Sequence, residues 1–165
     1  MEWIPDYLQI AFDTLYALPP EECYCTLLFY AAHADGRWLC GHIGDGYIFR
    51  IRQDTAVVFS APENGHAINE TYFLSEPSAA QHLRIRSGEL HEPYAVLLTS
   101  DGGGDTLFDR QQQQPAHAVE RLCDWLTEND EKTVTEALQH VIKEKMIPAT
   151  EDDVSVAILY CGEDE

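Results

Sequence analysis

The pattern of apolar and polar positions predicts a helix followed by a run of strands. Apolar residues recur at helical spacing over residues 5–18, and "LPPEE" ends that helix. Residues 23–51 are rich in β-branched, aromatic and apolar side chains, interrupted by "ADGR" and "GDG". This pattern predicts strands over about 23–33, 37–43 and 47–51, the first two as a hairpin. A fourth strand is predicted over 55–60.

The second half of the chain predicts more strands and a pair of helices. Residues 61–76 are polar and contain Pro and Asn-Gly, which indicates a loop. Strands are predicted over 82–90 and 94–100, and helices over about 110–129 and 132–145, the latter with Thr133 or Thr135 as its N-cap. The glutamine run before Pro115 is interpreted as a solvated loop.

A last strand is predicted over 151–160. Its mainly apolar continuation suits a central, covered position in a sheet. Strands first, then a helix pair, then a final strand indicate the α+β class with a largely antiparallel sheet, and 165 residues suit one domain, 1–165.

Composition narrows the possible partners and compartment. The net charge of −19 repels phosphate backbones, so no nucleic-acid partner is expected, whereas clustered carboxylates attract divalent cations. No apolar run approaches the ~18 residues that a membrane span needs, so no membrane partner is expected. The acidic start lacks the features of a signal peptide, and five scattered cysteines without CxxC spacing suggest reduced core thiols. Both observations favour the cytosol.

Short acidic side chains occur where apolar strands meet loops. Asp45 lies in a Gly-Asp-Gly turn, Asp101 follows "VLLTS", and Asp152 precedes "VSVAIL". If these strands are neighbours, their ends bring the carboxylates to one rim, where a hard cation with oxygen ligands relieves the repulsion between them. The three glycines between Asp101 and Asp105 would then give cations and phosphate room to approach.

Each of these residues also has a structural explanation when it is taken alone. Asp45 can be a turn residue, as Asp35 is expected to be in "HADGRW", and Asp101 can cap a helix. Asp105 can be a surface charge, and Asp152 can protect a strand edge. His42, on an apolar strand, is expected to be a hydrogen-bonded sheet residue or a site residue. Only the combination of the aspartates, in this order, favours a metal site.

Three segments, "HIGDGYIFRI", "AVLLTSDGGGD" and "EDDVSVAIL", resemble the later motifs of the metal-dependent (PPM, type 2C) protein serine/threonine phosphatases. "APENGHAINETYFLSE" resembles the loop that follows the Gly-Asp strand in a bacterial subgroup. The resemblance covers roughly residues 8–160 and implies the C-terminal two-thirds of the family domain, which is an antiparallel β-sandwich with flanking helices. The family's N-terminal arginine that holds phosphate, and its aspartate that bridges two metals, have no counterpart in this alignment.

The resemblance also implies roles for single residues. Asp101 and Asp152 would share one ion of a Mg²⁺ or Mn²⁺ centre, and Asp45 and Asp105 would belong to a third, weaker metal site. The implied reaction is hydrolysis of phosphoserine or phosphothreonine in protein substrates by a metal-activated water. The alternative is a catalytically inactive phosphatase-like module for binding or regulation. A sandwich that lacks strands exposes edges, so a homo-oligomer is expected in either case.

Overall fold

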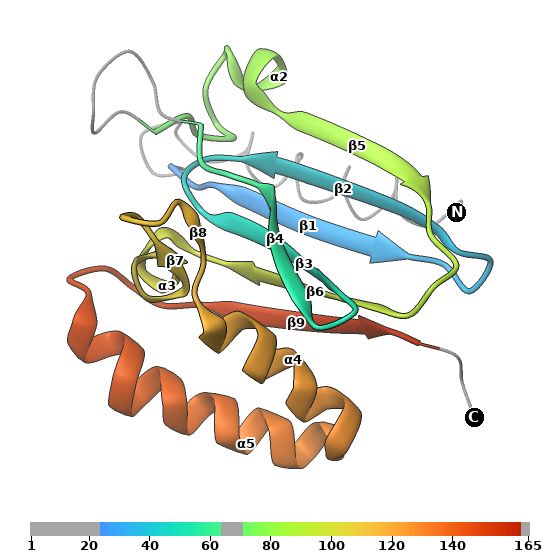
Figure 1. Cartoon of the computed structure of the whole chain (residues 1–165). Coiled ribbons are helices and arrows are strands. Elements are labelled where there is room, and N and C mark those ends of the chain that lie inside the picture. The colour runs from blue at the N-terminus through green and yellow to red at the C-terminus, as the bar shows by residue number, and fades with distance from the viewer. Residues whose placement is uncertain (1–23, 64–70, 163–165) are drawn as a thin grey trace.

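The computed structural model describes residues 24–63 and 71–162, which form two antiparallel sheets and a layer of helices (Figure 1). The predicted helix over residues 5–18 lies outside the described residues. The first sheet has the strand order β1-β2-β5, and the second has the order β4-β3-β6-β9. The α+β sandwich expected from the sequence is therefore confirmed.

The first sheet consists of β1 (Leu27–Ala32), β2 (Arg37–Ile43) and β5 (Arg84–Glu89). The turn between β1 and β2 contains Asp35, whose carboxylate accepts hydrogen bonds from the backbone and side chain of Arg37, and Gly36, which has a φ of 86°. Asp35 is therefore a turn residue, as its Asp-Gly sequence predicts.

The second sheet consists of β3 (Tyr47–Arg52), β4 (Thr55–Ser60), β6 (Tyr94–Thr99) and β9 (Val156–Cys161). β3 pairs with β4 and β6, so the Gly-Asp-Gly segment after β2 carries the chain from one sheet to the other. The prediction of a central position for the last strand is wrong. β9 pairs only with β6 in the described part of the chain, and Leu159 and Tyr160 are exposed on it.

Alternate residues of the central strands serve two separate cores. Ile48 and Val96 face the first sheet and pack with Tyr94, whereas Phe49 and Leu97 face the helices. All four residues are fully buried. Successive side chains of a strand point to opposite faces of the sheet, so in β3 and β6 one set packs on the first sheet and the other set packs on the helices. It fixes the register of β3 against β6, and with it the relative position of the ends of these strands.

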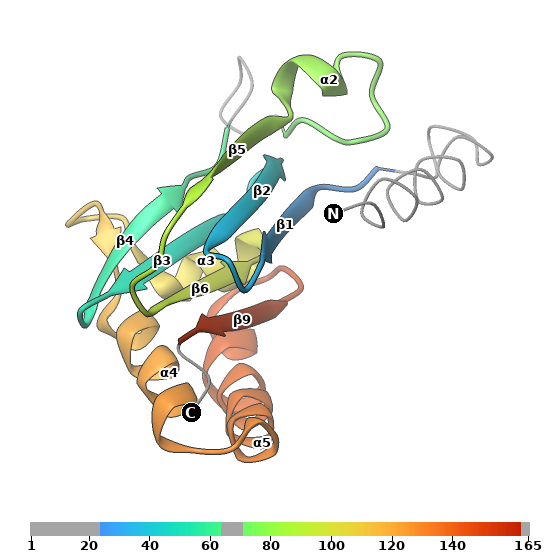
Figure 2. The same ribbon diagram turned by 90° about the vertical axis from the view of Figure 1, so that its right-hand side faces the viewer.

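The helical layer covers the face of the second sheet opposite the first sheet (Figure 2). It contains α4 (His117–Glu128) and α5 (Glu131–Val141), and α5 continues into a π-helical turn (Ile142–Met146) and a 3₁₀ turn (Ile147–Ala149). The N-cap of α5 is Asp130, not Thr133 or Thr135. Its carboxylate accepts hydrogen bonds from the backbone N–H and the hydroxyl of Thr133. Asp130 lies three residues before Thr133, which is the spacing at which an N-cap carboxylate reaches the free N–H groups of the first turn.

Three short elements complete the described chain: α2 (Ala79–His82), α3 (Asp101–Leu107) and the hairpin of β7 (Phe108–Asp109) with β8 (Gln114–Pro115). The glutamine run, interpreted from the sequence as a solvated loop, is the turn of this hairpin. The first predicted helix of the pair consequently begins at His117 rather than near residue 110.

Candidate metal centre

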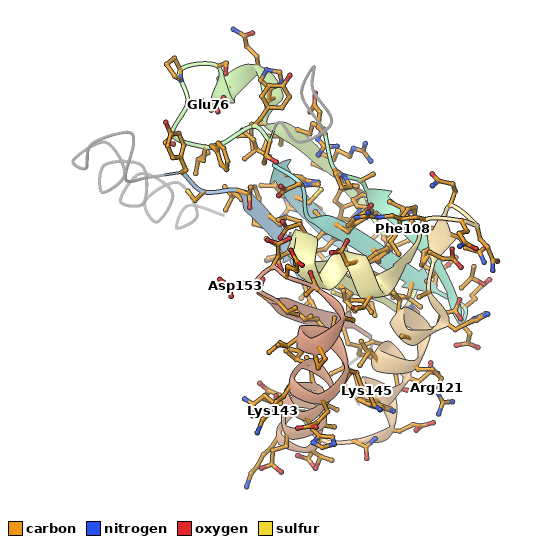
Figure 3. All side chains as sticks on the ribbon, turned by 90° about the vertical axis from the view of Figure 1, so that its left-hand side faces the viewer. Glu76, Phe108, Arg121, Lys143, Lys145 and Asp153 are labelled. Atoms are coloured by element: carbon orange, nitrogen blue, oxygen red, sulfur yellow. The ribbon has the colours of Figure 1, made fainter. Side chains whose placement is uncertain are left out.

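A cleft of about 820 Å³ lies at the end of the second sheet where β3 and β9 begin and β6 ends. All four aspartates singled out in the sequence line it: Asp45, Asp101, Asp105 and Asp152. The other lining residues are Tyr47, Ala61, Pro62, Thr71, Phe108, Arg110 and Gln113. Figure 3 views this side of the molecule, with α3 between the labelled residues Phe108 and Asp153. The structure thus brings together the strand-end carboxylates that the sequence suggested.

Asp101 is placed by the passage from β6 into α3. The strand ends at Thr99, Ser100 takes the N-cap position with extended backbone, and Asp101 is the first helical residue. The backbone N–H of Gly102 donates to Oδ1 of Asp101 at 2.8 Å, which orients the carboxylate. Asp101 is therefore a first-turn residue, and the cap assigned to it as a structural alternative belongs to Ser100.

The charges of the other three aspartates act on Asp101. Partial burial raises the pKa of Asp101 above its ordinary value, the hydrogen bond from Gly102 opposes that rise, and the charges of Asp45, Asp152 and Asp105 add to it. The cleft is therefore a set of mutually repelling carboxylates in the metal-free chain.

Asp152 is held beside Asp101 by a network centred on Ser100. The Ser100 hydroxyl donates to the carbonyl of Asp153 at 2.9 Å and accepts from the N–H of Ser155 at 3.0 Å. The backbone N–H of Ser100 donates to the carbonyl of Ser155. Three hydrogen bonds thus fix the segment before β9 against the start of α3. Among the described residues none donates a hydrogen bond to the carboxylate of Asp152, which leaves it available to a ligand.

The three glycines of α3 serve close packing, not access for a ligand as expected from the sequence. A Cβ on Gly102 would lie 2.8 Å from the carbonyl oxygen of Asp153, and one on Gly103 would lie 1.9 Å from Oγ1 of Thr99. A Cβ on Gly104 would meet the ring of Tyr47 at 2.6 Å. All three glycines are buried. Their lack of side chains lets α3 lie directly on the strand ends and brings Asp101 to Asp152.

Asp45 and Asp105 are held by hydroxyl groups. The hydroxyl of Thr71 donates to Oδ2 of Asp45 at 2.6 Å, and that of Thr150 donates to Oδ2 of Asp105 at 3.0 Å. Asp45 follows Gly44, whose φ of 113° suits glycine at the crossing between the sheets. Arg110 forms an ion pair with Oδ1 of Asp105 at 2.6 Å. Both carboxylates therefore have fixed orientations in the cleft.

The apolar wall of the cleft is aromatic. Tyr47 stacks on Phe108, with ring centroids 5.0 Å apart, and on Phe49 at 5.5 Å. Burial raises the pKa of Tyr47, so its hydroxyl stays neutral at physiological pH. A wall of this kind limits the access of water to one side of the carboxylates.

The donor set fits a hydrated magnesium-type ion better than a fully enclosed one. Within residues 24–63 and 71–162, no three His, Cys, Asp or Glu side chains lie close enough together to enclose a metal ion. Mg²⁺, however, keeps several of its waters and is commonly bound by only one or two carboxylates. Asp101 and Asp152, oriented by Ser100 and Gly102, meet that requirement with oxygen ligands of the right charge.

Three polar lining residues, Thr71, Arg110 and Gln113, were not found from the sequence as site residues. Nor was Thr150, which does not line the cleft but donates a hydrogen bond to Asp105. Asp109 followed by a polar run is a turn signal that could have indicated the hairpin, and with it Arg110. No sequence signal places the hydroxyls of Thr71 and Thr150 near carboxylates so far away in the chain.

His42 is buried in the first sheet and lies outside the cleft. It is 1% exposed, and its Nδ1 lies 2.8 Å from the hydroxyl of Ser60, while its Nε2 has no hydrogen-bond partner among the described residues. Burial, with the positive charge of Arg84, lowers the pKa of His42 to about 4. His42 is thus the sheet histidine of the two alternatives, with only one of its nitrogens satisfied.

The comparison with known families decides the family of this chain. The family model for protein phosphatase 2C matches residues 6–143. The chain belongs to the protein phosphatase 2C family. A search of the curated proteins found no match to the chain.

Solved structures with the same fold are serine/threonine phosphatases and related domains. The phosphatase domain of the cell fate determinant SpoIIE from Bacillus subtilis is 19% identical, with a TM-score of 0.51 over 95% of this chain and 68% of that one. The serine/threonine phosphatase of S. agalactiae is 16% identical, with a TM-score of 0.56 over 99% of this chain and 72% of that one. The catalytic domain of the phosphatase PstP in complex with two manganese ions is 17% identical, with a TM-score of 0.52 over 82% of this chain and 56% of that one.

The chain thus spans 56% to 72% of the lengths of these three structures. At such identities the likeness concerns the fold. In the described residues no helix is long and apolar enough to cross a membrane.

Proposed function

We propose that this protein phosphatase 2C-family chain hydrolyses phosphomonoesters of serine and threonine in protein substrates, with the help of Mg²⁺ or Mn²⁺. The observation that carries the proposal is the convergence of Asp45, Asp101, Asp105 and Asp152 on one cleft, next to Arg110. Water displaces the seryl or threonyl oxygen at phosphorus, so that the free hydroxyl and inorganic phosphate leave.

Asp101 and Asp152 would hold the principal ion, and Asp45 and Asp105 a weaker one. When bound, such an ion supplies positive charge for the phosphate oxygens and lowers the pKa of a water ligand. The chain's own residues position the carboxylates. Gly102 orients that of Asp101, and Ser100 fixes the backbone before β9 that carries Asp152. The hydroxyls of Thr71 and Thr150 orient those of Asp45 and Asp105.

Phosphate release from a phosphothreonine peptide, measured against Mn²⁺ concentration, tests this function. Saturable release that Asp101→Asn abolishes is expected. Asp35→Asn is the matched control, because Asp35 is an exposed turn carboxylate remote from the cleft lining. No release from the wild-type chain at saturating Mn²⁺ would refute turnover by this chain.

A second candidate is a phosphatase-like module that binds a partner without turnover. It is motivated by the family resemblance, in which the phosphate-holding arginine and the metal-bridging aspartate have no counterpart among the aligned residues. In that case Asp101→Asn would remove metal binding but leave partner binding unchanged.

We propose in addition that the chain forms a homo-oligomer through β9. The strand is uncharged from Val156 to Cys161, pairs on one side only among the described strands, and exposes Leu159 (37%) and Tyr160 (42%). Light scattering should give a dimer for the wild type and a smaller mass for Leu159→Lys. A wild-type monomer would contradict this proposal.

We further propose a domain organisation and a cellular compartment for the chain. The chain would form a single phosphatase-like domain equivalent to the C-terminal two-thirds of the family's, in a bacterial protein of the cytosol. Cys40 and Cys161 are free thiols, which suits a reducing compartment.

A further inference from the structure

The hairpin that contains the glutamine run holds an arginine at the mouth of the carboxylate cleft. Asp109 accepts hydrogen bonds from the backbone N–H groups of Gln111 and Gln112, at 2.8 and 3.0 Å, which closes the turn. The side-chain amide of Gln113 donates to the carbonyl of Arg110 at 2.8 Å. The backbone at Arg110 is therefore fixed, and both Arg110 and Gln113 line the cleft.

Arg110 is the single cationic side chain among the described residues that line this cleft, against four aspartates. A phosphate dianion that enters such a cleft meets strong repulsion unless positive charge offsets it. A metal ion offsets part of that charge on the side of Asp101 and Asp152. Arg110, paired with Asp105, is positive charge that the chain itself brings to this cleft.

The ion pair of Arg110 with Asp105 is suited to exchange. The Arg110 side chain is 74% exposed and reaches Asp105 through one nitrogen, so water competes with the pair and it contributes little to stability. Asp105 keeps its hydrogen bond from Thr150 when the arginine leaves. Asp105 therefore keeps the guanidinium at the cleft through an ion pair weak enough to be exchanged for another anion.

We propose that Arg110 is the phosphate-binding residue of this chain: its guanidinium exchanges Asp105 for the phosphate dianion of the phosphorylated serine or threonine. The exchange replaces one carboxylate contact by a doubly charged group that a guanidinium can bind through two parallel hydrogen bonds. The inference rests on the proposed function, because it names the residue that positions its substrate.

The role predicts a split between binding and turnover. A residue that binds phosphate equally in the ground state and the transition state changes KM and leaves kcat nearly constant. Loss of a charge-assisted bidentate contact corresponds to a KM increase of roughly 10- to 100-fold. A lysine at this position keeps the charge but loses the fork, so an intermediate increase is expected.

The experiment compares the wild type with Arg110→Gln, Arg110→Lys and the matched control Arg121→Gln. Arg121 is an exposed arginine of α4, so its substitution removes the same charge far from the cleft (Figure 3). Inorganic phosphate binding is measured by calorimetry in the presence of Mg²⁺, and KM and kcat are measured with a phosphothreonine peptide. Unfolding curves establish that each variant folds.

Weaker phosphate binding and a raised KM in Arg110→Gln, with Arg121→Gln like the wild type, are expected. Equal phosphate affinity in the wild type and Arg110→Gln would overturn the inference, whatever the turnover. Phosphate binding that depends on Arg110 in a chain that releases no phosphate from the peptide would support the inference and refute the proposed catalysis instead. Equal weakening in both glutamine variants would show a general charge effect and overturn the inference.

Discussion

Replacement of Gly102 by alanine tests whether the packing of α3 builds the metal centre. The new Cβ would lie 2.8 Å from the carbonyl oxygen of Asp153 and 3.0 Å from that of Asp152, both backbone atoms. Since neither can rotate away, the segment before β9 must move. The movement displaces Asp152 from Asp101 and strains the hydrogen bonds by which Ser100 ties that segment to the start of α3.

The expected loss of stability in Gly102→Ala is small, because two terms oppose each other. Overpacking of this kind costs about 1–3 kcal/mol, whereas alanine in place of glycine in a helix returns about 1 kcal/mol. The net destabilisation of the metal-free chain is therefore about 0–2 kcal/mol.

The effect of Gly102→Ala on metal binding should be larger. Loss of the groups that orient a ligand typically weakens metal affinity by about 10–100-fold. With Mn²⁺ at 100 times the wild-type dissociation constant, bound metal stabilises the wild type by about 2.7 kcal/mol. The same Mn²⁺ concentration would stabilise the variant by only about 0.4–1.4 kcal/mol.

Urea unfolding with and without Mn²⁺ measures both quantities. Ala118→Gly in α4 is the control, because it destabilises an exposed helical position by about 1 kcal/mol without touching the cleft. It should keep the full metal-induced gain. If Gly102→Ala also keeps that gain, the close contact of α3 with the 152–153 backbone does not position the ligands.

Three other predictions follow from charge and backbone conformation. Asp101→Asn removes repulsion between carboxylates, so it should stabilise the metal-free chain at pH 7, by less than about 1 kcal/mol because solvent screens that repulsion. Unfolding in the presence of a chelator measures this gain, and a loss of stability would contradict the prediction. The pKa of His42 is lowered to about 4, so protons bind the unfolded state first and stability is lost as pH falls from about 6.5 to about 4, by about 3 kcal/mol in total. His42→Gln should flatten that part of the curve of unfolding free energy against pH, and an unchanged curve would refute the assignment. Asn-Gly in place of Gln53 and Asp54, both of positive φ in the β3–β4 turn, should raise the unfolding free energy by about 1 kcal/mol, whereas no increase in a melting curve would argue against backbone strain there.

The strands could be predicted from the sequence because their signals are local. The largely apolar runs of Tyr47–Arg52 and Tyr94–Thr99 indicate strands covered on both faces, whatever lies on either side. Which sheet a strand joins depends on long-range pairing, so the transfer of β3 away from β2 and the outer position of β9 could not be deduced. The apolar content of β9 was interpreted as a sign of centrality, although it pairs on one side only among the described strands.

Some residues of the candidate site could likewise be predicted from local sequence signals, and others could not. Asp45, Asp101 and Asp152 could be found because each lies where an apolar strand meets a loop, and strand ends of one sheet meet, whereas Asp105 was implied by the family resemblance. The meaning of the glycines between Asp101 and Asp105 could not be found, because their tight contacts are with Thr99, Tyr47 and the 152–153 backbone, which only the folded chain brings near. Arg110 was missed for a related reason. A polar run with a high glutamine content gives no indication of the direction of its turn.

Direct Mn²⁺ binding, followed by the electron paramagnetic resonance signal of the free ion, tests the central claim that the cleft is a divalent-cation site. The acidic surface also attracts cations, so the comparison must separate a site from its surroundings. Wild type and Asp35→Asn should take up Mn²⁺ with the same saturable affinity, and Asp101→Asn should lose that uptake. Equal uptake by wild type and Asp101→Asn would contradict the account.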